Sequence, residues 1–147
     1  MSQGKTTTLG MALATALGAE FTTATAAYTR AYPSDLKADD GIQVVVTPIA
    51  PKRTRAGWGS IVNETALGVV VMSKLTGTSA GTYDATQLDA LELLVDSIMD
   101  YLLDAIKLDT NAVCVSAEAE YGDHYTNHLT EKDEFHVPIT THWKMIG

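Results

Sequence analysis

Two histidines and their acidic neighbours are the residues whose types and spacing come closest to a metal site. His124 and His128 are four residues apart, which would align them on one face of a helix and could begin a zinc site. Glu120, Glu131 and Asp133 are possible third ligands, but no Cys or His at ligand spacing completes the set. The surrounding residues are also polar, so we expect a solvated segment and no bound metal.

An acidic row with strict four-residue spacing is the next candidate for chemistry. Its members are Glu92, Asp96, Asp100 and Asp104. A catalytic carboxylate pair needs one member whose pKa is raised by an apolar pocket, whereas an evenly spaced row is typical of a solvated helix face. Like charges at this spacing destabilise a helix slightly. That cost leaves room for a functional reason, such as facing a channel that must not hold DNA.

Nucleotide binding and nucleophilic catalysis lack the residues that they need. Gly4, Lys5 and Thr6 look like the end of a phosphate-binding loop, but that motif needs a glycine five positions before Gly4, and only three residues precede it. Cys114 is the single cysteine and lies in an expected strand, and the sequence has no Gly-x-Ser-x-Gly nucleophile motif. We therefore expect no enzymatic activity and no cofactor.

Basic residues are concentrated in a loop that we expect over residues 50–60. Lys52, Arg53 and Arg55 are three of the ten basic residues of the chain, and Trp58 follows them. One interpretation is a solvated hairpin tip. The other is an arm whose arginines pair with acids on a neighbouring subunit and whose tryptophan anchors the contact, since Arg and Trp are enriched in interface hot spots.

The composition limits the class of protein. A chain of 147 residues with 46% hydrophobic and 19% charged residues fits one globular domain over residues 1–147. The formal net charge of -8 argues against a protein that wraps nucleic acid, because such binding needs Lys and Arg to neutralise phosphates. No apolar run approaches the roughly 20 residues of a membrane span. The stretch from Leu9 to Ala19 is rich in Ala and Thr and fits an amphipathic helix better than a signal peptide.

Two helices are expected from the hydrophobic spacing. The first has an apolar residue at every fourth position, which places them on one face: Leu9, Leu13, Leu17 and Phe21. The second begins with a plausible capping box at Asp84 and Gln87. Its apolar stripe then alternates spacings of three and four: Leu88, Leu91, Val95, Ile98, Leu102 and Ala105.

Four strands are expected between and after these helices. Residues 42–49 and 61–72 are rich in β-branched residues, and the second run ends apolar on both faces, which indicates a central strand. Val113 to Glu120 alternates and predicts a strand with one solvated face. Phe135 to Lys144 alternates as well, and Pro138 within it indicates a sheet edge or a bulge.

The connections between these elements complete the expected fold. Residues 22–41 are expected to be irregular, and residues 73–83 form an exposed loop rich in Gly, Ser and Thr. The order of elements lacks repeated strand–helix–strand units. We therefore predict an α+β domain with a roughly four-stranded, mainly antiparallel sheet flanked by two helices. The edge strand, Phe135 to Lys144, could pair with the sheet of a neighbouring subunit.

A series of landmarks runs along the chain from residue 9 to residue 144. In order they are Leu13 and Leu17 in the first helix, Tyr32-Pro33, Asp35-Leu36, Val44-Val45-Val46-x-Pro48, Arg55, Val69-Val70-Val71, a helix from Leu88 to Leu108, Tyr121, Leu129, Phe135 and Ile139-Thr140. Their order and spacing resemble the tail terminator (tail completion, or neck) proteins of long-tailed bacteriophages.

The resemblance implies a structural protein of the virion. Proteins of that family have a sheet flanked by helices and form hexameric rings that cap the tail tube and stop its polymerisation. Each ring offers a docking face to the head connector. The implied partners are further copies of the chain, the tail tube protein and the head connector or completion protein. The implied location is the tail or neck of the virion, and the host cytoplasm during assembly. Residues 50–60 and 73–83 would reach neighbouring subunits or rings.

DNA would pass through the lumen of such a ring without specific binding. An acidic lumen repels phosphates. We therefore expect some of the row from Glu92 to Asp104, or Glu118 and Glu120, to face the channel, and Lys52, Arg53, Arg55, Trp58 and Pro138 to lie at subunit interfaces.

Other functions remain open at the level of sequence. Within a virion, the chain could be a head-completion or connector protein, or a tail tube subunit that polymerises without limit. From another class, it could be a small cytosolic ligand-binding or enzymatic α+β domain. That class would require a concave pocket with convergent polar groups.

Overall fold

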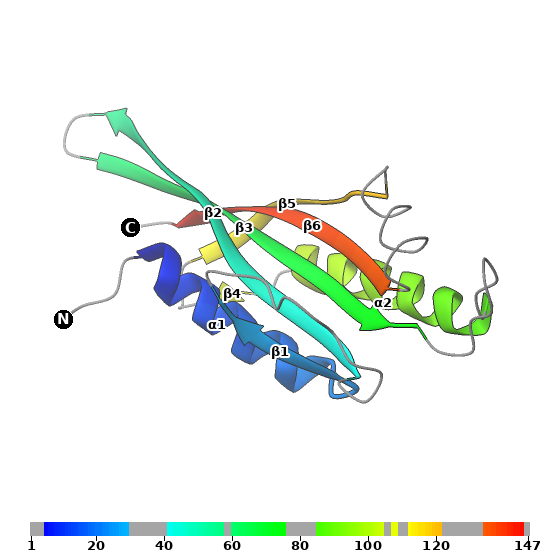
Figure 1. Ribbon diagram of the computed structural model, residues 1–147. Helices are drawn as coiled ribbons and strands as arrows, with labels where there is room; N and C mark the ends of the chain where they lie inside the picture. The colour runs from blue at the N-terminus through cyan, green and yellow to red at the C-terminus, as the bar shows by residue number, and fades with distance from the viewer. Residues whose placement is uncertain are drawn as a thin grey trace.

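A computed structural model of the chain describes residues 5–29, 41–57, 60–75, 85–104, 107–108, 112–121 and 134–145. Within these residues, two helices and a single mixed sheet form the structure, and the expected α+β class is confirmed (Figure 1). In chain order the elements are α1 (Lys5–Glu20), β1 (Ala24–Tyr28), β2 (Ile42–Gly57), β3 (Ser60–Lys74), α2 (Ala85–Leu103), β4 (Lys107–Leu108), β5 (Ala112–Ala119) and β6 (Glu134–Met145).

The strands lie in the order β1-β2-β3-β6-β5-β4. β1 is parallel to β2 and all other neighbouring pairs are antiparallel, so the mainly antiparallel character is confirmed. The expected number of four strands is too low, because the described residues contain five longer strands and the two-residue β4. The longer strand that was missed, β1, has the sequence ATAAY, whose alanines have little β propensity. Pairing with Val44 and its neighbours on β2 defines it as a strand.

β2 continues through the segment that was expected to be a loop. Its backbone stays paired with β3 as far as Gly57, and one register shift between Pro48 and Ala50 leaves Ile49 as an extra residue. The sequence predicts that Pro48 and Pro51 end this strand, and that prediction is wrong. The Thr29 N–H donates to the Val46 carbonyl (2.9 Å), so Val46 faces the β1 side of β2.

The phase of β2 explains why its prolines do not end it. Alternation along the strand places Pro48 on the same side as Val46, and after the bulge it places Pro51 there too. At both prolines the missing N–H would have pointed away from β3, so neither proline removes a hydrogen bond between β2 and β3. Prolines are tolerated in a strand when they face a free edge in this way.

Pro138 lies inside the sheet, and the expectation that it marks an edge or a bulge is wrong. β6 has β3 on one side and β5 on the other, and no register shift falls at Pro138. The Pro138 carbonyl accepts a hydrogen bond from the Glu120 N–H (3.0 Å), so the missing N–H of the proline would also point toward β5. β5 ends at Ala119. The proline thus costs only the terminal bond of that ladder.

Both helices cover the same face of the sheet (Figure 1). The predicted stripes are confirmed at Leu9, Leu13 and Leu17, which are at most 1% exposed, and in α2 from Leu91 to Leu102, where the stripe is buried. Phe21, which follows the end of α1, and Leu88 are half-buried, and Ala105 lies outside the described residues. The stripes pack on alternate residues of the central strands: Val44, Val46, Leu67, Val69, Val71, Phe135, Val137, Ile139 and Trp143. Each such side chain stabilises the fold by roughly 1.5–3 kcal/mol relative to exposure.

Two details fix the helices and the core to the sheet. The ring of Tyr28 lies against Gly10, where a Cβ atom would collide with it, so a glycine inside α1 allows β1 to approach closely. In the core, the Trp143 Nε1–H donates to the Thr141 hydroxyl (2.8 Å), which donates to the Leu67 carbonyl (2.8 Å). This chain of bonds satisfies the polar groups that burial removes from water.

Candidate subunit interface

β2 and β3 extend past the rest of the sheet as a two-stranded arm (Figure 1). β1 pairs with β2 only as far as Val46, and β6 pairs with β3 only from Asn63 onward. We call residues 50–57 of β2 and residues 60–62 of β3 the arm. Its backbone carries Lys52, Arg53 and Arg55 in a strand, in place of the loop that was expected. Trp58 lies outside the described residues.

The free edges of the sheet are not where the sequence indicated. β6 is an interior strand, so the expectation that Phe135 to Lys144 forms an edge available to a neighbour is wrong. β4 pairs only with the first residues of β5, Ala112 and Val113. Among the described residues, no strand therefore lies beside the outer edge of β5 from Cys114 to Ala119, and β1 has no strand on its outer side.

The phase of β5 follows from that of β6. Because Pro138 faces β5, Thr140 and His142 face it too, and their partners Glu118 and Ser116 face back toward β6. The N–H and C=O groups of Ala117 and Ala119 must then point outward from the sheet. β5 thus presents backbone donors and acceptors at two alternate positions.

The acidic row of α2 is exposed at Asp96, Asp100 and Asp104 and half-buried at Glu92. Its two halves have different surroundings. Asp100 and Asp104 line a hollow of about 580 Å³ between the ends of the two helices, together with Glu20, Phe21, Ser97, Tyr101 and Leu103.

Two tyrosines show where the negative charges act. Burial raises the pKa of Tyr101, and the charge of Glu20 raises it further. Phe21 packs edge-on against the Tyr101 ring, with 5.6 Å between centroids. At the other end of the row, burial raises the pKa of Tyr121, and the charges of Glu92 and Asp96 add to the effect.

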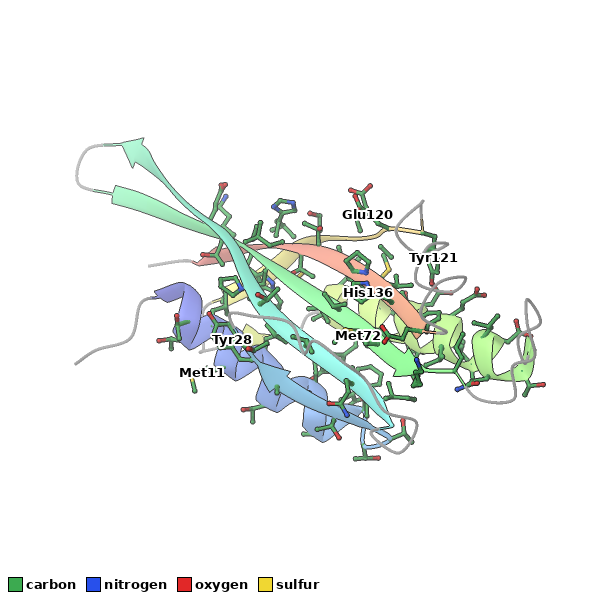
Figure 2. All side chains as sticks on the ribbon, viewed as in Figure 1. Met11, Tyr28, Met72, Glu120, Tyr121 and His136 are labelled. Carbon is green, nitrogen blue, oxygen red and sulfur yellow. The ribbon has the colours of Figure 1, made fainter. Side chains whose placement is uncertain are left out.

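Glu118 and Glu120 are exposed at the end of β5, and Glu118 lies on the face without helices. Figure 2 shows the side chains of Glu120 and Tyr121 pointing to opposite sides at the end of β5. The charges of Glu92 and Asp96 act on Tyr121, so the acids of α2 lie close to the end of β5, but not on the face that carries Glu118.

The face without helices carries a small second core and a hollow. Val45, Val70 and Met72 are buried on this face, and Met72 lies opposite His136 across β3 and β6 (Figure 2). Further along, a hollow of about 420 Å³ is lined by Glu64, Ala66, Val115, Ser116, His142 and Lys144, with Thr65 and Trp143 at its base. Sequence reasoning missed this hollow, because it forms only where three strands meet.

The described residues hold few groups suited to catalysis. Burial raises the pKa of the Cys114 thiol to about 11, although backbone hydrogen bonds near Ser116 and His142 oppose the rise, and a neutral thiol is a poor nucleophile. No group of three His, Cys, Asp or Glu side chains that could hold a metal occurs within the described parts of the chain. His124, His128, Glu131 and Asp133 lie outside those parts, as do Gly4 and Asp84.

Among the described residues, no helix is long and apolar enough to cross a membrane. No protein-family model matches the sequence, and no curated protein is significantly similar to it.

Proposed function

We propose that this protein is a structural subunit of a bacteriophage tail or neck, a tail terminator that assembles into a ring and joins the tail tube to the head connector. The observation that carries the proposal is the arm, a basic two-stranded extension that leaves the body of the sheet. A two-stranded extension whose far end no described strand flanks gains little from protruding into water, and it is suited to contact with another molecule.

The free edges of the sheet support self-assembly. The arm and the outer edge of β5 are different surfaces, and a contact between different surfaces of identical subunits is heterologous. Such contacts generate a closed ring when the rotation between subunits closes. The landmark residues that resemble tail terminators favour a hexamer.

The acids favour a lumen through which DNA passes without binding. Glu92 and Asp96 on α2 act on Tyr121 just after β5, and Glu118 and Glu120 are exposed at the end of β5. If this end lines the channel, its charge repels phosphates. Asp100 and Asp104 line the hollow between the ends of the two helices. We therefore assign the lumen to Glu92, Asp96, Glu118 and Glu120.

Gold-labelled antibodies against the chain, applied to virions whose genome encodes it, test the proposal. Label at the junction of head and tail is expected, and label along the whole tube would identify a tube subunit. Label in the head alone would favour a head-completion protein. Absence of label from virions, with the protein present in infected cells, would contradict a structural role.

A second candidate rests on the hollow between β3, β5 and β6. Its polar groups converge, as in a small ligand-binding site. The exposed side chains of Ser116 and His142 lie opposite each other in the register. To test this candidate, small molecules are screened for changes in the NMR signal of His142. The candidate requires a ligand that also protects the Ser116 amide from hydrogen exchange.

A further inference from the structure

We propose that the arm of one copy of this chain adds to the outer edge of β5 of the next copy, continuing its sheet across the subunit boundary. This inference rests on the proposed function, since it names the surfaces that would hold the ring together. It replaces the expectation that β6 supplies the paired edge.

The receiving surface is the outer edge of β5. Ala117 and Ala119 direct their N–H and C=O groups away from β6. Natural edges are usually protected by proline, by lysine or by a covering element. Between Cys114 and Ala119, β5 has neither proline nor lysine, and no described strand covers it.

The inserting surface is the outer edge of β2. Pro48 and Pro51 occupy outward-facing positions without an N–H, which stops a strand from pairing beside the base of the arm. The next outward-facing positions are Arg53 and Arg55, whose backbones are free to donate and accept. These two are separated by one residue, as are Ala117 and Ala119. An antiparallel register of the two pairs would form about four backbone hydrogen bonds.

Charge gives this contact its orientation. Lys52, Arg53 and Arg55 make the arm basic, whereas Glu118 lies between the two receiving residues and Glu120 follows them. When Arg53 pairs with Ala119 and Arg55 with Ala117, the same register puts Lys52 directly opposite Glu120 on one face of the extended sheet. Opposite charges across neighbouring strands stabilise their pairing. The other free edge, β1, has the sequence ATAAY and no charge, so charge directs the arm to β5. With a net charge of -8, two copies otherwise repel each other.

The contact must be made between copies. β3 and β6 lie between β2 and β5, which puts about 14 Å between the arm's strand and β5 of the same chain, at roughly 4.8 Å per strand. An arm that continues β2 in a straight line cannot fold back across them. The pairing is therefore head-to-tail.

Charge exchange at the contact is the first test, measured by sedimentation velocity at low salt. Glu120→Arg and Lys52→Glu are each expected to weaken association about tenfold, and combining them restores it. Asp104→Arg is the matched control, because it makes the same charge change at the hollow between the helices. We expect less than about twofold from it. Equal losses from Glu120→Arg and Asp104→Arg, or no rescue by the combination, would overturn the proposal.

Amide hydrogen exchange on the unmodified protein is the second test and needs no variant that could misfold. The amides of Ala117, Ala119, Arg53 and Arg55 are expected to become protected as protein concentration rises. Free exchange of these amides in an assembled ring would refute the pairing while leaving the proposed function intact. A monomer at every concentration up to about 1 mM would also refute it, and antibody labelling of virions then decides separately whether the proposed function fails.

Ala117→Pro addresses the backbone directly. It removes an outward N–H that no described strand pairs with, so assembly should be lost while the melting temperature stays close to that of the wild type. The control is Ala27→Ser on β1, which leaves assembly unchanged. Normal association of a folded Ala117→Pro protein would contradict sheet extension through β5.

Discussion

The body of the molecule and its arm are held together in different ways. In the body, two helices cover one face of the sheet and the large side chains beneath them, such as Trp143 and Phe135, are fully buried. Beyond Asn63, β2 and β3 have only each other as described strand partners, and Arg55 lies in this part of the arm. Lys52 and Arg53 lie opposite Glu64 and Asn63, which also pair with β6. Stability should therefore depend on the body, and assembly on the arm. Changes in the body should unfold the chain, and changes in the arm should leave it folded.

Trp143→Ala should give the largest loss of stability. The indole is fully buried and its N–H donates to the Thr141 hydroxyl, so its removal leaves a cavity and takes away the donor to that hydroxyl, which still donates to the Leu67 carbonyl. We expect the free energy of unfolding to fall by about 3–5 kcal/mol in urea titrations. Val115→Ala, at a side chain that is 59% exposed, is the control and should change it by less than about 0.5 kcal/mol. Similar effects of the two would break the distinction.

Thr141→Val keeps the shape of the side chain and removes its hydroxyl. The Trp143 N–H and the Leu67 carbonyl then lose their partner in the core. A loss of about 1–3 kcal/mol is expected by the same titration, because buried groups are left unsatisfied. The same change at the preceding residue, Thr140→Val, falls on the opposite face and should be within about 0.5 kcal/mol of the wild type.

Gly10→Ala should cost stability although alanine is the better helix former. Its Cβ would meet the ring of Tyr28, which must shift. We expect a net loss of about 1–2 kcal/mol. Gly18→Ala lies in the same helix with its nearest atom, the Ala26 Cβ, at 3.7 Å, so it should be neutral or stabilise by up to about 1 kcal/mol. Thermal unfolding followed by circular dichroism compares the two, and the same sign for both would contradict the close packing of β1.

Substitution in the arm should have the smallest effect on stability. Arg53→Ala combined with Arg55→Ala should change the free energy of unfolding by less than about 0.5 kcal/mol, because no described strand flanks β2 on its outer side in the arm. Association, measured by sedimentation, should weaken in the same protein. A large loss of stability would show that the arm contributes to the stability of the body, and would contradict its separate role in assembly.

Much of the body could be predicted from the sequence. The leucines of α1 and the stripe of α2 repeat with helical spacing, and the alternation of β6 marks its buried side. In β5 the register shift between Cys114 and Ser116 breaks the alternation, so Cys114 is buried and Val115 is exposed. These signals are local, because the spacing of apolar residues along the chain indicates directly which side of a helix or strand is buried.

The surfaces for assembly could not be predicted in the same way. Whether Pro48 ends a strand, and whether Pro138 marks an edge or a bulge, depends on which neighbour the missing N–H would face, and that phase is fixed by pairing with distant residues. β1 is rich in alanine and gives no strand pattern, and without β1 the edges of the sheet cannot be located. Glu92 and Asp96 are far from Tyr121 in the chain, and only the fold shows that their charges act on it.

A cryo-electron microscopy map of the neck of the virion that encodes this chain tests whether the chain forms a ring there. We expect one closed ring of this chain, with the arm of each subunit continuing the sheet of the next at β5 and with acids facing the lumen. A ring with a basic lumen, or a neck that contains no copy of this chain, would contradict it.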